Sequence, residues 1–175
     1  MTKAGSKKSP VIGIAGRSGS GKTTLIERLL PLFRGQGLRV AVIKHTHHEL
    51  EFDVPGKDSY RFKHAGAATS ILVSRTGLGV VKDFEDEPSL DDIIALYAMD
   101  MDMVVVEGFK HERSPKIEVF TADRGEPPLC LSGDDGFIAI VTDEDIDVPL
   151  PRFSRNDIPA IAQFITSHIL SRGIP

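Results

Sequence analysis

The sequence has a single cysteine, Cys130, among 175 residues, so no disulfide can form within the chain. A chain that uses no disulfides is typical of a reducing compartment, and we expect a cytoplasmic protein. The sequence also lacks any apolar run near the roughly 20 residues that a membrane-spanning helix needs. An early apolar stretch is interrupted by Arg17, which argues against a signal peptide. We therefore expect no membrane partner.

The sequence also has no excess of positive charge. The chain has 21 Lys and Arg against 25 Asp and Glu, a net charge of −4. Proteins that bind nucleic acid through its phosphate backbone usually present a basic surface, so we do not expect a nucleic-acid partner. No internal repeat or low-complexity segment is visible. The length suits one compact domain.

What the sequence does contain is an uninterrupted match to the pattern G-x-x-x-x-G-K-[ST]. The matching residues, with the threonine that follows them, are Gly16, Arg17, Ser18, Gly19, Ser20, Gly21, Lys22, Thr23 and Thr24. Glycines allow the backbone N–H groups of such a loop to surround phosphate oxygens, while the lysine reaches the β- and γ-phosphates and the threonine hydroxyl can ligate Mg²⁺. An apolar strand at Pro10–Ala15 precedes the loop, and apolar residues at helical spacing follow it. The sequence therefore predicts a P-loop that binds a nucleoside triphosphate, with Lys22 as a catalytic residue.

Strands and helices alternate along the rest of the chain. Further strands are expected at Leu38–Lys44, Thr69–Ser74, Gly79–Lys82, Met103–Val106, Ile117–Thr121 and Phe137–Thr142, and further helices at Asp58–Ala65, after Ser89, and after Asn156 or Asp157. This alternation predicts an α/β fold of the P-loop NTPase type, with a mostly parallel sheet flanked by helices and some antiparallel edge strands. We expect a flexible polar tail at residues 1–9 and one nucleotide-binding domain at residues 10–175.

The strand Met103–Val106 ends in an acid, Glu107, which is the layout of a Walker B strand. An acid at this position can reach the Mg²⁺ shell or hold an attacking water, so Glu107 is a candidate catalytic and metal-binding residue. The alternative is a solvated acid that merely ends a buried strand. Asp102 precedes the strand, on the side of the sheet away from the phosphates, and we expect it to be structural.

The densest polar cluster is Lys44–His48, which contains His45, His47 and His48 and is followed by several acids. The histidines and carboxylates could ligate a transition metal, contact an anionic ligand or a partner, or form a plain polar loop. No cysteine joins the set and its spacing matches no zinc signature, so a loop that faces the phosphates or a partner is favoured. Asp53, within the same loop, could complete a Mg²⁺ shell with Thr23 and Glu107.

Several blocks of the sequence, taken together and in order, resemble the molybdopterin-guanine dinucleotide biosynthesis adapter (MobB) family. These blocks are Ser18–Leu25, Ile43–His48, Asp53–Tyr60, Ala65–Ala67 and Val106–Glu112. The resemblance implies a homodimeric GTP-binding protein with slow intrinsic hydrolysis that assists the guanylyltransferase joining GMP to molybdopterin. It also implies GTP and Mg²⁺ as cofactors, and molybdopterin as a further possible ligand.

Three features bear on this expectation. The N-K-x-D pattern that reads guanine in many GTPases is missing, so GTP follows from the resemblance alone. Arg17 could act on the phosphates of a second subunit, although an arginine near its own phosphates or in solvent is the simpler interpretation. The rival function is a self-sufficient small-molecule kinase or ATP-dependent ligase, which would normally carry an Arg-rich lid.

Overall fold

The structure is a computed structural model that describes residues 9–46, 54–108, 114–123 and 125–173. Its contacts divide the chain into two compact units. The larger unit comprises the described residues up to His45 and from Leu90 onward, and the smaller unit those from Thr46 to Ser89. The single domain expected at residues 10–175 stays a prediction.

The larger unit contains a six-stranded sheet in the order β2-β5-β1-β6-β7-β8, in which every neighbouring pair is parallel. Its elements are β1 (Val11–Ala15), α1 (Lys22–Gly35), β2 (Val40–Lys44), α3 (Leu90–Tyr97), β5 (Met103–Glu107), β6 (Lys116–Val119), the 3₁₀ turn η1 (Leu129–Leu131), β7 (Phe137–Val141), β8 (Arg152–Phe153) and α4 (Ile158–Gly173). Because all strands are parallel, their carboxyl ends lie along one edge of the sheet, where open α/β sheets bind ligands.

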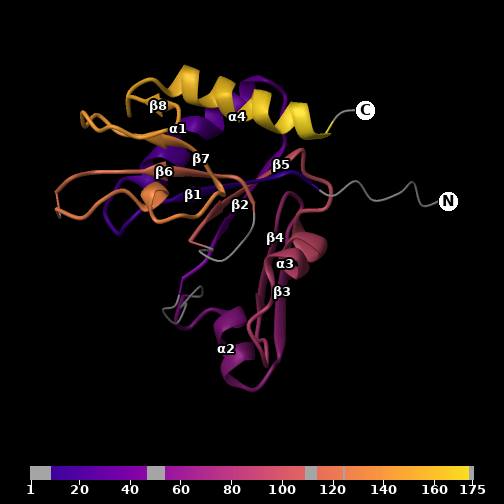
Figure 1. Ribbon diagram of the computed structural model, residues 1–175. Coiled ribbons are helices and arrows are strands. Elements are labelled where there is room, and N and C mark those ends of the chain that lie inside the picture. The colour runs from indigo at the N-terminus through magenta and orange to yellow at the C-terminus, as the bar shows by residue number, and fades with distance from the viewer. Residues whose placement is uncertain (1–8, 47–53, 109–113, 124, 174–175) are drawn as a thin grey trace. The chain divides into compact units, whose positions relative to one another are not determined.

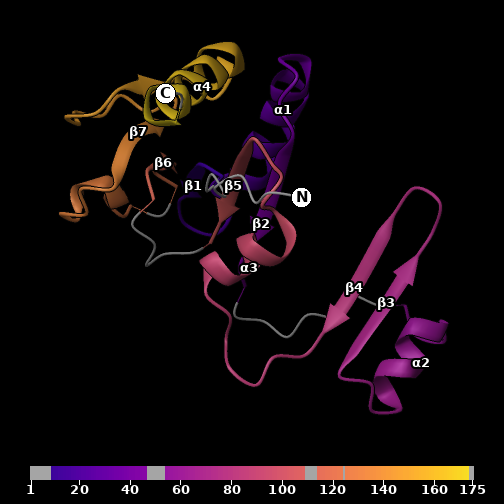
Figure 2. The same ribbon diagram turned by 90° about the vertical axis from the view of Figure 1, so that its right-hand side faces the viewer.

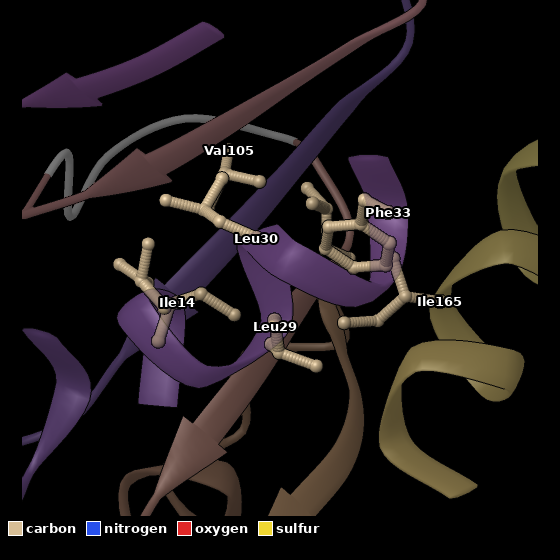
Figure 3. Close-up of a pocket in the computed structure, with 8 residues that line it drawn as sticks. Ile14, Leu29, Leu30, Phe33, Val105 and Ile165 are labelled. Carbon is tan, nitrogen blue, oxygen red and sulfur yellow. The ribbon is translucent and has the colours of Figure 1, made fainter. Parts of the chain in front are cut away.

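Helices α1 and α4 cover one face of this sheet, as Figure 1 shows. The apolar faces of both helices pack on alternating side chains of the central strands, such as Ile12 and Ile14 of β1. Figure 3 shows side chains that line a small pocket in this core, among them Phe33 of α1 and Ile165 of α4. The pocket leaves no space for a water molecule, so it is part of the packed core.

The opposite face of the sheet packs on α3. Leu90 and Ile94 of that helix contact Val104 and Val106 of β5. All residues of β5 are buried, as its run of β-branched side chains predicts for a strand covered on both faces. At the amino end of β5, Asp102 accepts a hydrogen bond from the backbone N–H of Arg39 (2.7 Å), in agreement with its expected structural role.

The smaller unit consists of α2 (Asp58–His64) and an antiparallel pair, β3 (Thr69–Val73) and β4 (Leu78–Lys82). Figure 2 shows α2 beside these strands. The antiparallel strands expected from the sequence thus form a sheet of their own. Several of the apolar side chains of the pair are exposed, namely Ile71, Leu72, Val73 and Leu78.

Two features at the ends of elements refine the sequence-based expectations. Asp157 is the residue that caps α4, since its carboxylate accepts a hydrogen bond from the N–H of Ala160 (3.2 Å). Ser9, the last residue of the expected tail, is buried, and its hydroxyl donates to the carbonyls of Ala98 and Met101 (2.9 Å each). The chain is therefore anchored one residue earlier than expected.

Candidate functional site

The carboxyl ends of β2, β5 and β1 lie side by side at one edge of the sheet. The register pairs Glu107 of β5 with Lys44 of β2 and with Ile14 of β1. The G-x-x-x-x-G-K-T loop follows β1 directly and leads into α1 at Lys22. The fold therefore brings together the loop, Glu107 at the carboxyl end of β5 and Lys44 at the carboxyl end of β2, as the strand pattern predicts.

The loop starts with a close backbone approach at Gly16. This residue has φ +143°, and a methyl group on it would lie 2.4 Å from the carbonyl oxygen of Val119 and 2.7 Å from the hydroxyl oxygen of Ser20. No residue with a side chain fits there without displacing the loop or β6. Glycine is therefore required at position 16 for two reasons: a side chain has no room, and the backbone has a positive φ.

Inside the loop, two donors converge on one carbonyl. The ammonium group of Lys22 donates to the carbonyl oxygen of Arg17 (2.9 Å), and the N–H of Ser20 donates to the same oxygen (3.2 Å). The hydroxyl oxygen of Ser20, whose residue is 1% exposed, has no hydrogen-bond partner among the described residues. A buried hydroxyl of this kind suits a loop that receives a polar ligand.

Thr23, Glu107 and Lys44 form the polar edge of the site. The hydroxyl of Thr23 donates to the carboxylate of Glu107, 3.1 Å from Oε2 and 3.4 Å from Oε1. The ammonium group of Lys44 lies 3.4 Å from Oε1 of the same carboxylate. Glu107 is 7% exposed, so its charge is held in a buried position by these two partners.

His45 begins the histidine-containing loop next to this acid. Its backbone N–H donates to the carbonyl oxygen of Glu107 (2.8 Å), which continues the pairing of β2 with β5 by one residue. His47, His48 and Asp53 lie outside the described residues. Within the described parts of the chain, no group of three or more His, Cys, Asp or Glu side chains could hold a metal ion.

The remaining loop residues differ in exposure. Ser18, Gly19 and Thr24 are exposed, whereas Arg17 is partly buried. The guanidinium group of Arg17 forms an ion pair with Glu126 of its own chain. The action of Arg17 across a dimer stays a prediction.

Two residues that sequence reasoning missed contact the loop. One is Glu126, through its pair with Arg17. The other is Arg155, whose guanidinium group donates to the carbonyl oxygen of Ser20 (3.0 Å). Neither lies in a recognisable motif, because each reaches the loop from a segment distant in sequence.

The carboxyl group of Asp143 lies next to Arg155. Its pKa is lowered chiefly by the hydrogen bond from the Ser154 hydroxyl, and secondly by the hydrogen bond from the Arg155 N–H.

The residues present fit a magnesium–nucleotide complex in two respects. The hydroxyl of Thr23 and the carboxylate of Glu107 are oxygen donors of the kind that Mg²⁺ prefers, and they already lie within hydrogen-bonding distance. The loop places a glycine-lined turn, a lysine and the first turn of a 14-residue helix in one place, and this combination favours an anionic group.

No helix in the described residues is long and apolar enough to span a membrane. Comparisons with known proteins identify a family for this chain. A family model described as molybdopterin guanine dinucleotide synthesis protein B matches residues 11–143. The chain is 38% identical over 165 residues to a molybdopterin-guanine dinucleotide biosynthesis adapter protein of Escherichia coli, covering 93% of this chain and 94% of that protein.

A second relative of that name, from Haemophilus influenzae, is 38% identical over 157 residues, covering 89% of this chain and 87% of that protein. Among solved structures, a crystal structure of molybdopterin-guanine biosynthesis protein B superimposes with a TM-score of 0.72 at 31% identity, covering 90% of this chain and 99% of that one. By its sequence and by its fold, this chain belongs to the molybdopterin guanine dinucleotide synthesis protein B family.

Proposed function

We propose that the chain is a GTP-binding adapter that assists a guanylyltransferase in attaching GMP to molybdopterin, and that its own hydrolysis of GTP is slow. The names of the matched relatives support the adapter role. The observation that carries the nucleotide site is the contact between Thr23 of the loop and Glu107 at the end of β5. It joins the two parts that a P-loop protein needs to hold Mg²⁺ beside a triphosphate.

In this proposal the loop and its flanking residues act as follows. The loop N–H groups between Gly16 and Thr23 hold the phosphate oxygens, except that of Ser20, which donates to the Arg17 carbonyl. Lys22 moves from this carbonyl to the β- and γ-phosphates. Thr23 and Glu107, with Asp53, would hold Mg²⁺, which when bound neutralises phosphate charge. Burial of Glu107 beside Lys44 keeps its carboxylate positioned at the edge of the sheet.

The His45–His48 loop is proposed to face the phosphates or the partner enzyme. Its first residue, His45, supports this, because its backbone N–H donates to the carbonyl oxygen of Glu107 at the edge of the site. Molybdopterin is a further ligand that this loop could contact. The absence of disulfides supports a cytoplasmic setting.

The binding step is tested by calorimetry with GTP and Mg²⁺. The Lys22→Ala variant should bind GTP at least about tenfold more weakly, because a charge-assisted contact contributes about 1.5–3 kcal/mol. Lys82→Ala, which removes an exposed lysine of β4 that lies over the ring of Phe84, is the matched control and should keep the parental affinity. Equal affinities in the two variants would contradict the site, and competition with ATP measures the selectivity for guanine.

The adapter role is tested in a guanylyltransferase assay that contains molybdopterin and GTP. Wild-type protein should stimulate formation of the dinucleotide, whereas Lys22→Ala should not. If the purified chain instead phosphorylates a small acceptor stoichiometrically by itself, the kinase alternative replaces the adapter.

We further propose that two copies associate. The pair β3–β4 supports this, since an isolated two-stranded sheet is only marginally stable and Val73 of this pair is 78% exposed. Sedimentation of the wild-type chain should give a dimer that Val73→Asp weakens. Unchanged association of this variant would place the dimer contact elsewhere.

A further inference from the structure

Arg155 lies in the segment that joins β8 to α4, far in sequence from the P-loop. Its guanidinium group donates to the carbonyl oxygen of Ser20 in the loop (3.0 Å) and also to the carbonyl oxygen of Phe120, just beyond the end of β6. A methyl group built on Gly21 would lie 3.4 Å from a nitrogen of the same guanidinium. One side chain thus bridges the loop that follows β1 and the segment that follows β6.

The backbone of Arg155 is itself fixed from two sides. Its N–H donates to the carboxylate of Asp143 (3.0 Å), which also accepts a hydrogen bond from the hydroxyl of Ser154 (2.7 Å). Its carbonyl oxygen accepts a hydrogen bond from Arg28 on α1 (3.0 Å). These hydrogen bonds therefore hold in place the backbone that carries the guanidinium group.

The contact with the Ser20 carbonyl has a consequence for the next N–H group. In a planar trans peptide the C=O and the following N–H point in opposite directions. Because Arg155 holds the carbonyl of Ser20 on one side of the loop, the N–H of Gly21 is aimed to the other side. Gly21 has φ +94° and ψ +19°, and its own carbonyl accepts the first hydrogen bond of α1, from the N–H of Leu25 (2.9 Å).

We propose that Arg155 is a positioning residue of the nucleotide site, which holds the Ser20–Gly21 peptide so that the Gly21 N–H faces the phosphates. This inference rests on the proposed GTP-binding function. It adds a residue that belongs to neither sequence motif of the site. The guanidinium also places a positive charge beside the first turn of α1, where an anion is expected.

The test compares Arg155→Gln with the matched control Arg152→Gln. Arg152 is also an arginine of this region, but its guanidinium contacts Glu144, Asp145 and Ile146 and not the loop. GTP affinity in the presence of Mg²⁺ is measured by calorimetry for the full chain. We expect Arg155→Gln to bind at least tenfold more weakly than wild type and Arg152→Gln to remain within twofold.

A second measurement needs no nucleotide. Amide hydrogen exchange of Leu25, whose N–H bonds to Gly21, should be at least fivefold faster in Arg155→Gln, while that of Leu29 in the same helix is unchanged. A general loss of stability would instead accelerate both amides together.

The outcomes separate this inference from the proposed function. If wild type binds GTP and Arg155→Gln binds it within twofold, the positioning role is overturned and GTP binding stands. If wild type does not bind GTP, the proposed function fails, and exchange at Leu25 decides the positioning role alone. Should Arg155→Gln not fold, Asp143→Ala takes its place: a loss of affinity of about threefold supports the role, and parental affinity overturns it.

Discussion

The substitution Gly16→Ala tests whether the loop is packed as tightly as the structure indicates. The added methyl group would lie 2.4 Å from the carbonyl oxygen of Val119, whereas ordinary van der Waals contact begins near 3.4 Å. Either the loop or β6 must therefore shift by about 1 Å. Since β6 is a buried inner strand, the loop is expected to yield.

Two terms contribute to the loss of stability. Positive φ with a side chain is unfavourable by about 1–2 kcal/mol, and overpacking adds about 1–3 kcal/mol. Together they amount to about 2–5 kcal/mol, a large part of the 5–15 kcal/mol typical of a folded domain. Gly37→Ala is the matched control, because Gly37 has φ +80° and nothing lies within 4 Å of the added methyl. It should show the first term alone.

The assay is unfolding in urea for both variants, followed by calorimetry with GTP and Mg²⁺. Gly16→Ala should lose more stability than Gly37→Ala and should bind GTP at least tenfold more weakly, while Gly37→Ala keeps parental affinity. Equal losses of stability in the two variants would refute the close approach at Gly16. Parental GTP affinity in Gly16→Ala would refute the role of the loop as the phosphate site.

Three further predictions concern individual side chains. The variants Glu107→Gln and Asp53→Asn should each bind nucleotide normally without Mg²⁺, but their binding should depend less on Mg²⁺ than that of wild type. If both variants give the same Mg²⁺ titration as wild type, these acids have structural roles only. Burial and the neighbouring Glu118 raise the pKa of Cys130 from 9.0 to about 12, so alkylation by iodoacetamide at about pH 8 should be at least a hundredfold slower in the folded chain than in urea. The hydrogen bond from Lys116 lowers the pKa of Asp134 below 3.8, so its stabilising contribution is complete above that pH and lost as pH falls through the folded-state pKa. Asp134→Asn should therefore lower the melting temperature at neutral pH, with a difference from wild type that shrinks in acid.

The sequence predicts the loop, α1 and β5 well, because each is encoded by neighbouring residues. The G-x-x-x-x-G-K-T pattern defines the turn, and the run Met103–Val106 ending in Glu107 defines a buried strand with an acid at its carboxyl end. The contact of Thr23 with Glu107 then follows from the rule that parallel strands end at one edge. The predicted family is confirmed by the comparisons.

Other parts of the structure have no such local signal. β8 contains only Arg152 and Phe153, which is too short for an alternating pattern to be recognised. The contact of Arg155 with Ser20 joins residues 135 positions apart. Its acceptor is a backbone carbonyl, which every residue has, so the sequence does not predict the contact. The formation of a separate sheet by β3 and β4 depends on pairing partners that periodicity does not specify.

One contact within the loop and one from a distant segment explain how the loop keeps its shape. A phosphate-binding loop must turn its carbonyl dipoles away from the anion, since they would repel it. In this structure two of the loop carbonyls are each held by a cationic side chain, that of Arg17 by Lys22 and that of Ser20 by Arg155. The two cations differ in kind, because Lys22 belongs to the loop and is needed by the phosphates, whereas Arg155 is anchored outside it by Asp143 and Arg28. Arrival of a triphosphate should therefore draw Lys22 away from the carbonyl of Arg17, which keeps its hydrogen bond from the N–H of Ser20. The carbonyl of Ser20 stays held by Arg155, so that most of the loop is organised before binding and only Lys22 has to move.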